Sequence, residues 1–154
     1  MGVSGCGKTL IGKMLSKALS VPFFDADEFH SEENKTKMSS GIPLSDEDRQ
    51  PWLEKLNKEA RKHTFQGCVI ACSALKEKYR RLLIKGIEPN VQWVYLKGDY
   101  DTIYSRMNAR SDHYMPAEML QSQFDDLEEP GNAININVSL APEQIIKDIK
   151  QRLK

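Results

Sequence analysis

The stretch GVSGCGKT, residues 2–9, decides how the rest of the chain is interpreted. It matches the pattern GxxxxGK[ST] at every fixed position, with Gly2, Gly7, Lys8 and Thr9 in place. Glycines let successive backbone N–H groups turn toward a polyphosphate, the lysine reaches its outer phosphates, and the threonine hydroxyl can bind Mg²⁺. The sequence therefore predicts a phosphate-binding loop.

The alternative to this loop is a chance glycine-rich turn, and the residues that follow the motif disfavour it. A phosphate-binding loop opens an amphipathic helix, so apolar residues must recur at helical spacing directly after it. They do so at Leu10, Ile11, Met14, Leu15, Ala18 and Leu19.

Length, charge and apolar runs limit the class of protein. The 154 residues suit one α/β domain, and 22 basic residues balance 22 acidic ones, so no large net charge indicates nucleic acid or an anionic membrane as partner. No apolar run approaches the roughly 18 residues of a membrane span, and no signal peptide opens the chain. We expect a single cytoplasmic domain over residues 1–154.

Beyond the loop, short apolar runs alternate with helical patterns. The runs predict strands at residues 21–25, 68–72, 91–96 and 134–138. The helical patterns predict a helix that begins at Pro51 after a polar segment, and further helices at residues 76–84, 100–110, 116–124 and 142–153. This alternation predicts an α/β fold, with a parallel sheet covered by helices on both faces.

Two aspartates, Asp25 and Asp27, close the first of these runs. The carboxyl ends of parallel strands form a ligand crevice, so both acids are expected to face the phosphate loop. If the extended conformation continues, the two side chains point the same way, about 7 Å apart. One could hold Mg²⁺ through water and the other could accept a proton from a substrate hydroxyl. The alternative is that they cap the next helix.

Basic residues near the predicted crevice fall into two groups. Lys37, Arg49, Lys76 and Arg80 would be explained by a small anionic substrate, although each alone is also typical of a solvated surface.

In the second group, Arg106 and Arg110 stand four apart, share a helix face and could neutralise charge on a transferring phosphoryl group. The following loop contains His113, a candidate contact of phosphate or substrate for which a solvated loop histidine is the alternative.

Five stretches resemble one family over nearly the whole chain. They are GVSGCGKT (2–9), DADEFHSEENKTKMSSGIPLSDEDRQPWL (25–53), CSALKEKYRRLL (72–83), VYLKGDYDTIYSRMNAR (94–110) and HYMPAEMLQSQFDDLEEP (113–130). In these the chain resembles gluconokinases of the small phosphate-loop type, related in fold to shikimate and nucleoside monophosphate kinases. The resemblance implies a P-loop NTPase-type three-layer domain with a lid at approximately residues 106–124.

The resemblance also implies roles for individual residues. ATP and Mg²⁺ would bind to the loop, with Thr9 and Asp25 near the metal, and Lys8, Asp27 and Arg110 would act in catalysis, Asp27 on the 6-hydroxyl of the sugar acid. The gluconate pocket would comprise Asp27, His30, Lys37, Arg49, Lys76, Arg80 and His113. The nucleotide would contact Gly2, Val3, Ser4, Gly5, Cys6, Gly7, Lys8, Thr9, Arg106 and Arg110.

The expected function is ATP-dependent phosphorylation of D-gluconate to 6-phospho-D-gluconate, with a homodimer as one possible assembly. The alternatives are a kinase of another small hydroxy acid and a catalytically impaired nucleotide-binding protein. Shikimate is disfavoured because the chain contains no Gly-Gly pair, whereas similar shikimate kinases carry a triple-glycine loop.

One departure from the resemblance concerns the strand that normally precedes the loop, because only Met1 stands before Gly2. In the related fold this strand is central, and losing three or four buried aliphatic residues would remove roughly 5–10 kcal/mol from a total of about 5–15 kcal/mol. We expect a natural chain that extends upstream. We also expect a gap or a borrowed segment between the strands at residues 68–72 and 91–96.

Overall fold

The computed structural model describes residues 1–109 and 117–153, so Arg110 and His113 lie outside the described residues. In chain order the elements are α1 (Lys8–Leu19), β1 (Phe23–Asp25), the 3₁₀ helix η1 (Ala26–Phe29), α2 (Glu32–Ser39), α3 (Asp46–Lys62), β2 (Val69–Ala71), α4 (Glu77–Ile84), the 3₁₀ helix η2 (Glu88–Asn90), β3 (Trp93–Lys97), α5 (Tyr100–Asn108), α6 (Ala117–Asp126), β4 (Ala133–Asn137) and α7 (Pro142–Arg152).

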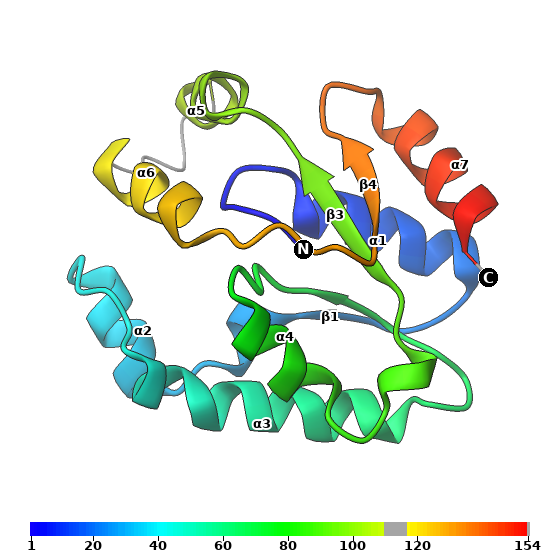
Figure 1. Ribbon diagram of the computed structural model, residues 1–154, viewed down its shortest axis with the longest axis horizontal. Helices are drawn as coiled ribbons and strands as arrows, with labels where there is room; N and C mark the ends of the chain where they lie inside the picture. The colour runs from blue at the N-terminus through cyan, green and yellow to red at the C-terminus, as the bar shows by residue number, and fades with distance from the viewer. Residues whose placement is uncertain (110–116, 154) are drawn as a thin grey trace.

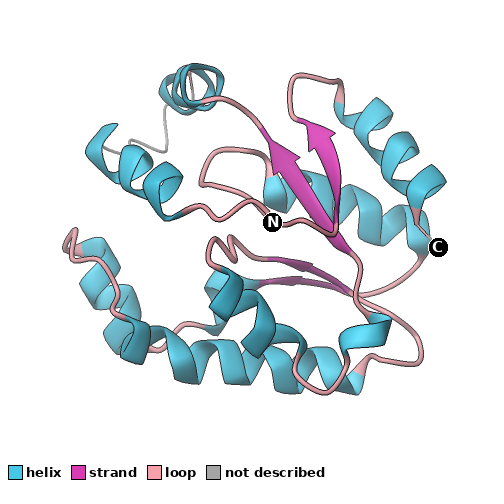
Figure 2. Ribbon diagram, in the orientation of Figure 1, coloured by secondary structure: helices cyan, strands magenta, loops and turns pink. Residues whose placement is uncertain are grey.

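The strands form two separate parallel pairs. β1 pairs with β2, so that Phe24 lies opposite Ile70, and β3 pairs with β4, so that Val94 lies opposite Ile134. Within the described residues β2 and β3 are not paired, and Figure 2 shows the two pairs apart, with the N-terminus beside them. The expected gap is present at this point.

Met1 and Gly2 connect the two pairs at one end of the gap. The Met1 amino group donates a hydrogen bond to the Val94 carbonyl at 2.6 Å, and the Met1 carbonyl accepts one from the Leu96 N–H at 3.0 Å. On the other side, the Gly2 N–H donates to the Ser73 carbonyl, just beyond β2, at 3.2 Å. Met1 and Gly2 therefore lie where the last two residues of a central strand would lie.

Helices cover the strands on both faces, which confirms the predicted α/β fold with a parallel arrangement of strands (Figure 1). One core joins α1, α5, α6 and α7 to β4 through side chains such as Leu15, Ile136 and Ile149. The other core lies around α3 and α4 and contains Leu53 and Leu56, which are almost fully buried. Among the described helices none is both long and apolar enough to cross a membrane.

The segment between β1 and β2 differs from the sequence expectation. α3 begins at Asp46 and not at Pro51, because Ser45 and Asp48 form a capping box at its start and Pro51 is accommodated inside the helix. The preceding segment, expected only to be polar, contains the helix α2, which begins after the cap residue Ser31. Almost every residue of α2 is polar, so it has no apolar periodicity from which a sequence analysis could detect it.

Candidate active site

The phosphate-binding loop has the backbone that its glycines permit. Gly7 has φ +98° and precedes α1 as its cap residue, so the loop turns directly into the helix N-terminus. Gly5 has φ +79°, and a Cβ there would lie 2.4 Å from Cγ of Met107 on α5. No acidic residue occupies the first turn of α1. The unpaired N–H groups and positive dipole end of this helix therefore favour an anion at the loop.

Two polar side chains of the motif are held by defined partners. The Lys8 ammonium donates to the Val3 carbonyl across the loop at 2.9 Å. The Thr9 hydroxyl donates to a carboxylate oxygen of Asp25 at 2.8 Å, so the two residues predicted to lie near a metal are in contact. Hydroxyl and carboxylate oxygens suit Mg²⁺, which usually binds few protein ligands and keeps several waters and phosphate oxygens.

The aspartate pair departs from the extended geometry expected for it. The chain leaves the β conformation at Ala26 and forms η1, whose cap residue is Asp25. The Asp25 carboxylate oxygen that does not contact Thr9 accepts a hydrogen bond from the Asp27 N–H at 3.2 Å. The capping alternative therefore applies to Asp25, which also contacts Thr9. Asp27, which follows Ala26 in η1, is exposed.

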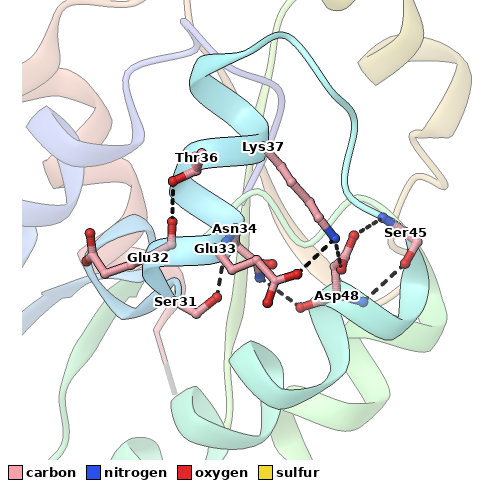
Figure 3. Close-up of polar contacts among 8 residues, drawn as sticks. All are labelled: Ser31, Glu32, Glu33, Asn34, Thr36, Lys37, Ser45 and Asp48. Carbon is pink, nitrogen blue, oxygen red and sulfur yellow. Dashed lines mark hydrogen bonds and ion pairs between the residues drawn. The ribbon is translucent and has the colours of Figure 1, made fainter.

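Lys37 on α2 is paired with two carboxylates. Its ammonium lies 2.7 Å from Asp48 at the start of α3 and 3.4 Å from Glu33 on its own helix, as Figure 3 shows. The hydrogen bond to Asp48 raises the pKa of Lys37, and the same contact lowers the pKa of Asp48. Asn34 donates to the Asp48 carbonyl at 2.8 Å. These contacts join α2 to the beginning of α3.

Arg49 connects α3 to α4 through an aromatic side chain. Its guanidinium donates to the Tyr79 hydroxyl at 3.0 Å and lies over the Tyr79 ring, 5.4 Å from its centroid. The hydroxyl in turn donates to Asp46 at 2.6 Å, and Lys78 forms an ion pair with the same carboxylate. Burial and the hydrogen bond to Asp46 raise the pKa of Tyr79.

Lys76 and Arg80, at the start of α4, contact different kinds of partner. Lys76 forms an ion pair of 2.9 Å with Asp126 at the end of α6. Arg80 is buried, and one guanidinium nitrogen donates to the carbonyls of Ala74 and Leu75, each at 2.9 Å. Ala74 has φ +45°, a conformation that non-glycine residues rarely adopt, and Arg80 stabilises this turn beside Gly2.

His30 is buried under the same group of helices. Its ring stacks on that of Trp52, with centroids 4.2 Å apart, and Trp52 donates to the Ala26 carbonyl at 2.7 Å. Burial lowers the pKa of His30, with Asp27 acting in the opposite direction. Within the described chain, Nδ1 of His30 is the one buried side-chain polar atom without a hydrogen-bond partner.

The structure also reveals a loop contact that the sequence did not indicate. The amide oxygen of Gln123, on α6, accepts from the Ser4 N–H at 2.7 Å, and its nitrogen donates to the Ser4 hydroxyl at 3.0 Å. A glutamine on a polar helix face has no distinguishing spacing, so only the packing of α6 identifies it. Arg106 is half-buried on α5.

The chain is similar to known proteins over most of its length. A family model described as shikimate kinase matches residues 4–154. A gluconokinase of Arabidopsis thaliana is 46% identical over 97% of this chain and 87% of its own length. The thermosensitive gluconokinase of Escherichia coli strain K12 is 51% identical over 84% of this chain and 70% of its own.

A solved structure supports the same assignment. The crystal structure of a gluconokinase from Sinorhizobium meliloti 1021 superimposes with a TM-score of 0.88 at 36% identity, covering 96% of this chain and 85% of that one. The matches in sequence and in structure extend from the phosphate-binding loop to the last helix, and on them the chain belongs to the shikimate kinase family of phosphate-loop enzymes, among its gluconokinases.

Proposed function

We propose that this chain transfers the γ-phosphoryl group of ATP to the 6-hydroxyl of D-gluconate, which gives ADP and 6-phospho-D-gluconate. The observation that carries the proposal is the 46% and 51% identity to gluconokinases over 97% and 84% of the chain. The geometry supports it, because a phosphate-binding loop, a Thr9–Asp25 contact and the exposed Asp27 adjoin one another in the fold.

The nucleotide is assigned to the loop and to the helix that follows it. The Gly2 and Ser4 N–H groups already bond to Ser73 and Gln123, so the later N–H groups of the loop and the N-terminus of α1 would surround the phosphates. The Lys8 ammonium would exchange the Val3 carbonyl for a phosphate oxygen. Thr9 and Asp25 are the residues that would hold Mg²⁺. When bound, the ion neutralises charge on the phosphates. Arg106 would contact the nucleotide from α5, and Arg110, which lies outside the described residues, is proposed for the same role.

The transfer step needs one base and one acceptor oxygen. The 6-hydroxyl oxygen forms a bond to the γ-phosphorus while the bond from that phosphorus to the bridging oxygen of ADP breaks. The hydroxyl proton passes to the Asp27 carboxylate, which is exposed to substrate on η1. Asp27 is therefore proposed as the general base, and Lys8 as the group that stabilises charge on the phosphates.

The acceptor pocket is proposed to lie among η1, α2, α3 and α4. Lys37, Arg49 and Lys76 are half-buried, and a gluconate carboxylate could compete for them with Asp48, Tyr79 and Asp126. We assign His30, through its unpartnered Nδ1, to a substrate hydroxyl, and His113 remains a candidate from the lid. Arg80 would contribute to this pocket by fixing the turn at Ala74 and Leu75.

The test is a coupled ADP-release assay with gluconate, its epimers, shikimate and nucleoside monophosphates. Gluconate is expected to give the highest kcat/KM. Higher turnover with another hydroxy acid would reassign the substrate, and absence of turnover with every acceptor would favour a nucleotide-binding protein. Magnesium titration of the same assay, sedimentation of the purified chain and fractionation of cells would test Mg²⁺ dependence, a homodimer and the cytoplasmic location that we also propose.

A further inference from the structure

The last turn of α6 contacts both binding regions of the proposed reaction. At one end, the Gln123 amide accepts from the Ser4 N–H of the phosphate-binding loop at 2.7 Å and donates to the Ser4 hydroxyl at 3.0 Å. Three residues further on, the Asp126 carboxylate lies 2.9 Å from the ammonium of Lys76, a residue proposed for the acceptor pocket. Residues three apart on a helix are neighbours on its surface. One helical turn therefore connects the nucleotide loop with the acceptor side.

The segment after α6 holds the turn that carries Lys76. The Glu128 N–H donates to the Leu75 carbonyl at 3.0 Å, and the Glu128 carboxylate accepts from the Glu77 N–H at 2.5 Å. Lys76 is the cap residue of α4, and a lysine side chain can only donate, so the cap for this helix comes from a distant carboxylate. The segment runs past the start of α4 toward β4 (Figure 1). Residues 126–128 thus bond to three consecutive residues of the turn.

Apolar packing fixes the position of this helical turn. Leu120, on α6, is fully buried, and the Phe124 ring lies 5.8 Å from that of Tyr100 on α5. Leu127 packs against both hydrophobic cores of the molecule. Because cores are densely packed, the last turn of α6 moves as a unit and a shift at its Ser4 contact also shifts its Lys76 contact.

We propose that Gln123 and Asp126 are positioning residues that connect the nucleotide loop with the acceptor pocket, so that bound ATP strengthens the binding of gluconate. The inference rests on the proposed function, which assigns gluconate to Lys76. Bound phosphates hold the loop, Gln123 holds α6 to Ser4 of that loop, and Asp126 holds Lys76.

The coupling is favourable because its cost is shared. The order that ATP imposes on the loop and on the last turn of α6 is already present when gluconate binds, so gluconate binds with a smaller loss of entropy. Lys76 has three donors and can share them between Asp126 and a gluconate oxygen. Linkage requires that gluconate strengthens the binding of ATP by the same factor.

The test is a calorimetric titration of gluconate into the chain alone and into the chain saturated with Mg²⁺ and the β,γ-imido analogue of ATP. The Kd for gluconate should be at least about fivefold lower with the nucleotide analogue. Equal Kd values in the two titrations would overturn the coupling while leaving the proposed function in place. Absence of gluconate binding in both titrations would overturn the proposed function and the coupling with it.

Hydrogen exchange followed by NMR examines the connection itself. The Glu128 amide, which bonds to Leu75, should become at least about threefold more protected when the nucleotide analogue binds. In Gln123→Ala the same amide should show little change, because the bonds to Ser4 are lost. Equal protection of Glu128 in the parent and in Gln123→Ala would contradict a path through Gln123.

Variants at the two ends separate positioning from general stability. Gln123→Ala and Asp126→Ala should each reduce the ratio of the two Kd values to less than about twofold, and the double variant should lose no more than either, because the contacts act in series. Asp126→Glu, which keeps the charge, should restore part of the ratio. Gln121→Ala, whose amide bonds to Asp125 on the same helix, is the matched control and should keep the full ratio. A full ratio in Gln123→Ala or Asp126→Ala, or an equal loss in Gln121→Ala, would overturn the proposal.

Discussion

The two ends of the space between the strand pairs are built differently. At the end beside the phosphate loop, hydrogen bonds hold each part: Met1 and Gly2 bond to both strand pairs, Arg80 fixes the turn after β2, and Gln123 holds Ser4. At the other end, between β2 and β3, lies an apolar cavity of about 310 Å³, which we call the interstrand slot and which Ile70, Val94 and Ile149 help to line.

This difference separates the residues proposed for catalysis from the segment that holds the phosphate-binding loop in place. The proposed catalytic residues are positioned by short polar contacts with a few neighbouring residues. The loop is held by Met1 and Gly2 alone, at a place where the fold has room for a longer strand. We therefore expect changes at the polar end to affect mainly turnover, and changes at the slot to affect mainly stability.

The largest effect is expected at the polar end, from Lys8→Ala. Because this ammonium is the one positive side chain within the loop motif, its loss should abolish measurable gluconate-dependent ADP release. The far-UV circular dichroism spectrum and Tm should stay close to those of the parent, since Lys8 is half-exposed. Lys17→Ala, an exposed lysine on the same helix, is the matched control. Near-normal turnover of Lys8→Ala would remove the phosphate-loop assignment.

The next largest effect is expected at the slot. A version extended upstream of Met1 by about six apolar residues should gain roughly 5–10 kcal/mol of unfolding free energy, seen as a rise in Tm of at least about 10 °C. ATP should also bind more tightly, because the loop would leave a strand bonded on both sides. An extension of six serines is the control for length. Equal Tm and equal ATP affinity for the extended and parent chains would show that the slot does not take a strand.

A smaller effect on turnover is expected from Asp27→Asn. Loss of a general base should lower kcat about 10²-fold or more, whereas the KM for gluconate should change less. Asp25→Asn is the matched comparison, since Asp25 contacts Thr9 and should alter the magnesium requirement first. If Asp25→Asn lowers kcat more than Asp27→Asn at saturating magnesium, the two roles are exchanged.

The buried Met1 amino group predicts that the free energy of unfolding depends on pH. Burial lowers the pKa of the Met1 ammonium from 8.0 to about 6, so between these pH values the unfolded chain binds more protons than the folded one. Unfolding free energy should therefore rise from pH 6 to pH 8, by up to about 3 kcal/mol. Denaturant unfolding of the free and the N-terminally acetylated chain would measure it. Equal slopes for the two forms would contradict the assignment to Met1.

The smallest effect is expected from Gln123→Ala, which removes both bonds to Ser4. The net loss is about 1 kcal/mol, so the KM for ATP should rise about fivefold while kcat stays within about twofold. Gln121→Ala, whose amide bonds to Asp125 on the same helix, is the control and should leave the KM for ATP unchanged. An equal change in both variants would assign the effect to α6 in general.

Local patterns in the sequence determined much of this molecule. The loop motif, the helix after it and the alternation of apolar runs with helical patterns depend on neighbours within a few residues, and β1, β2, β3 and β4 lie within two residues of their expected places. The Thr9–Asp25 contact followed from the parallel arrangement, because strands that run together end at one edge.

Only the tertiary structure decided which partner each polar side chain takes. Lys37, Arg49 and Lys76 bond to residues 11, 30 and 50 positions away, and Arg80 turns inward and donates to two backbone carbonyls. No periodic pattern in the sequence predicts any of these contacts. The sequence placed the start of α3 at Pro51, but the capping box of Ser45 and Asp48 begins the helix at Asp46, and Pro51 lies in its second turn. The gap itself was expected from the sequence, but the buried Met1 ammonium between two strand pairs arises from packing over long distances along the chain.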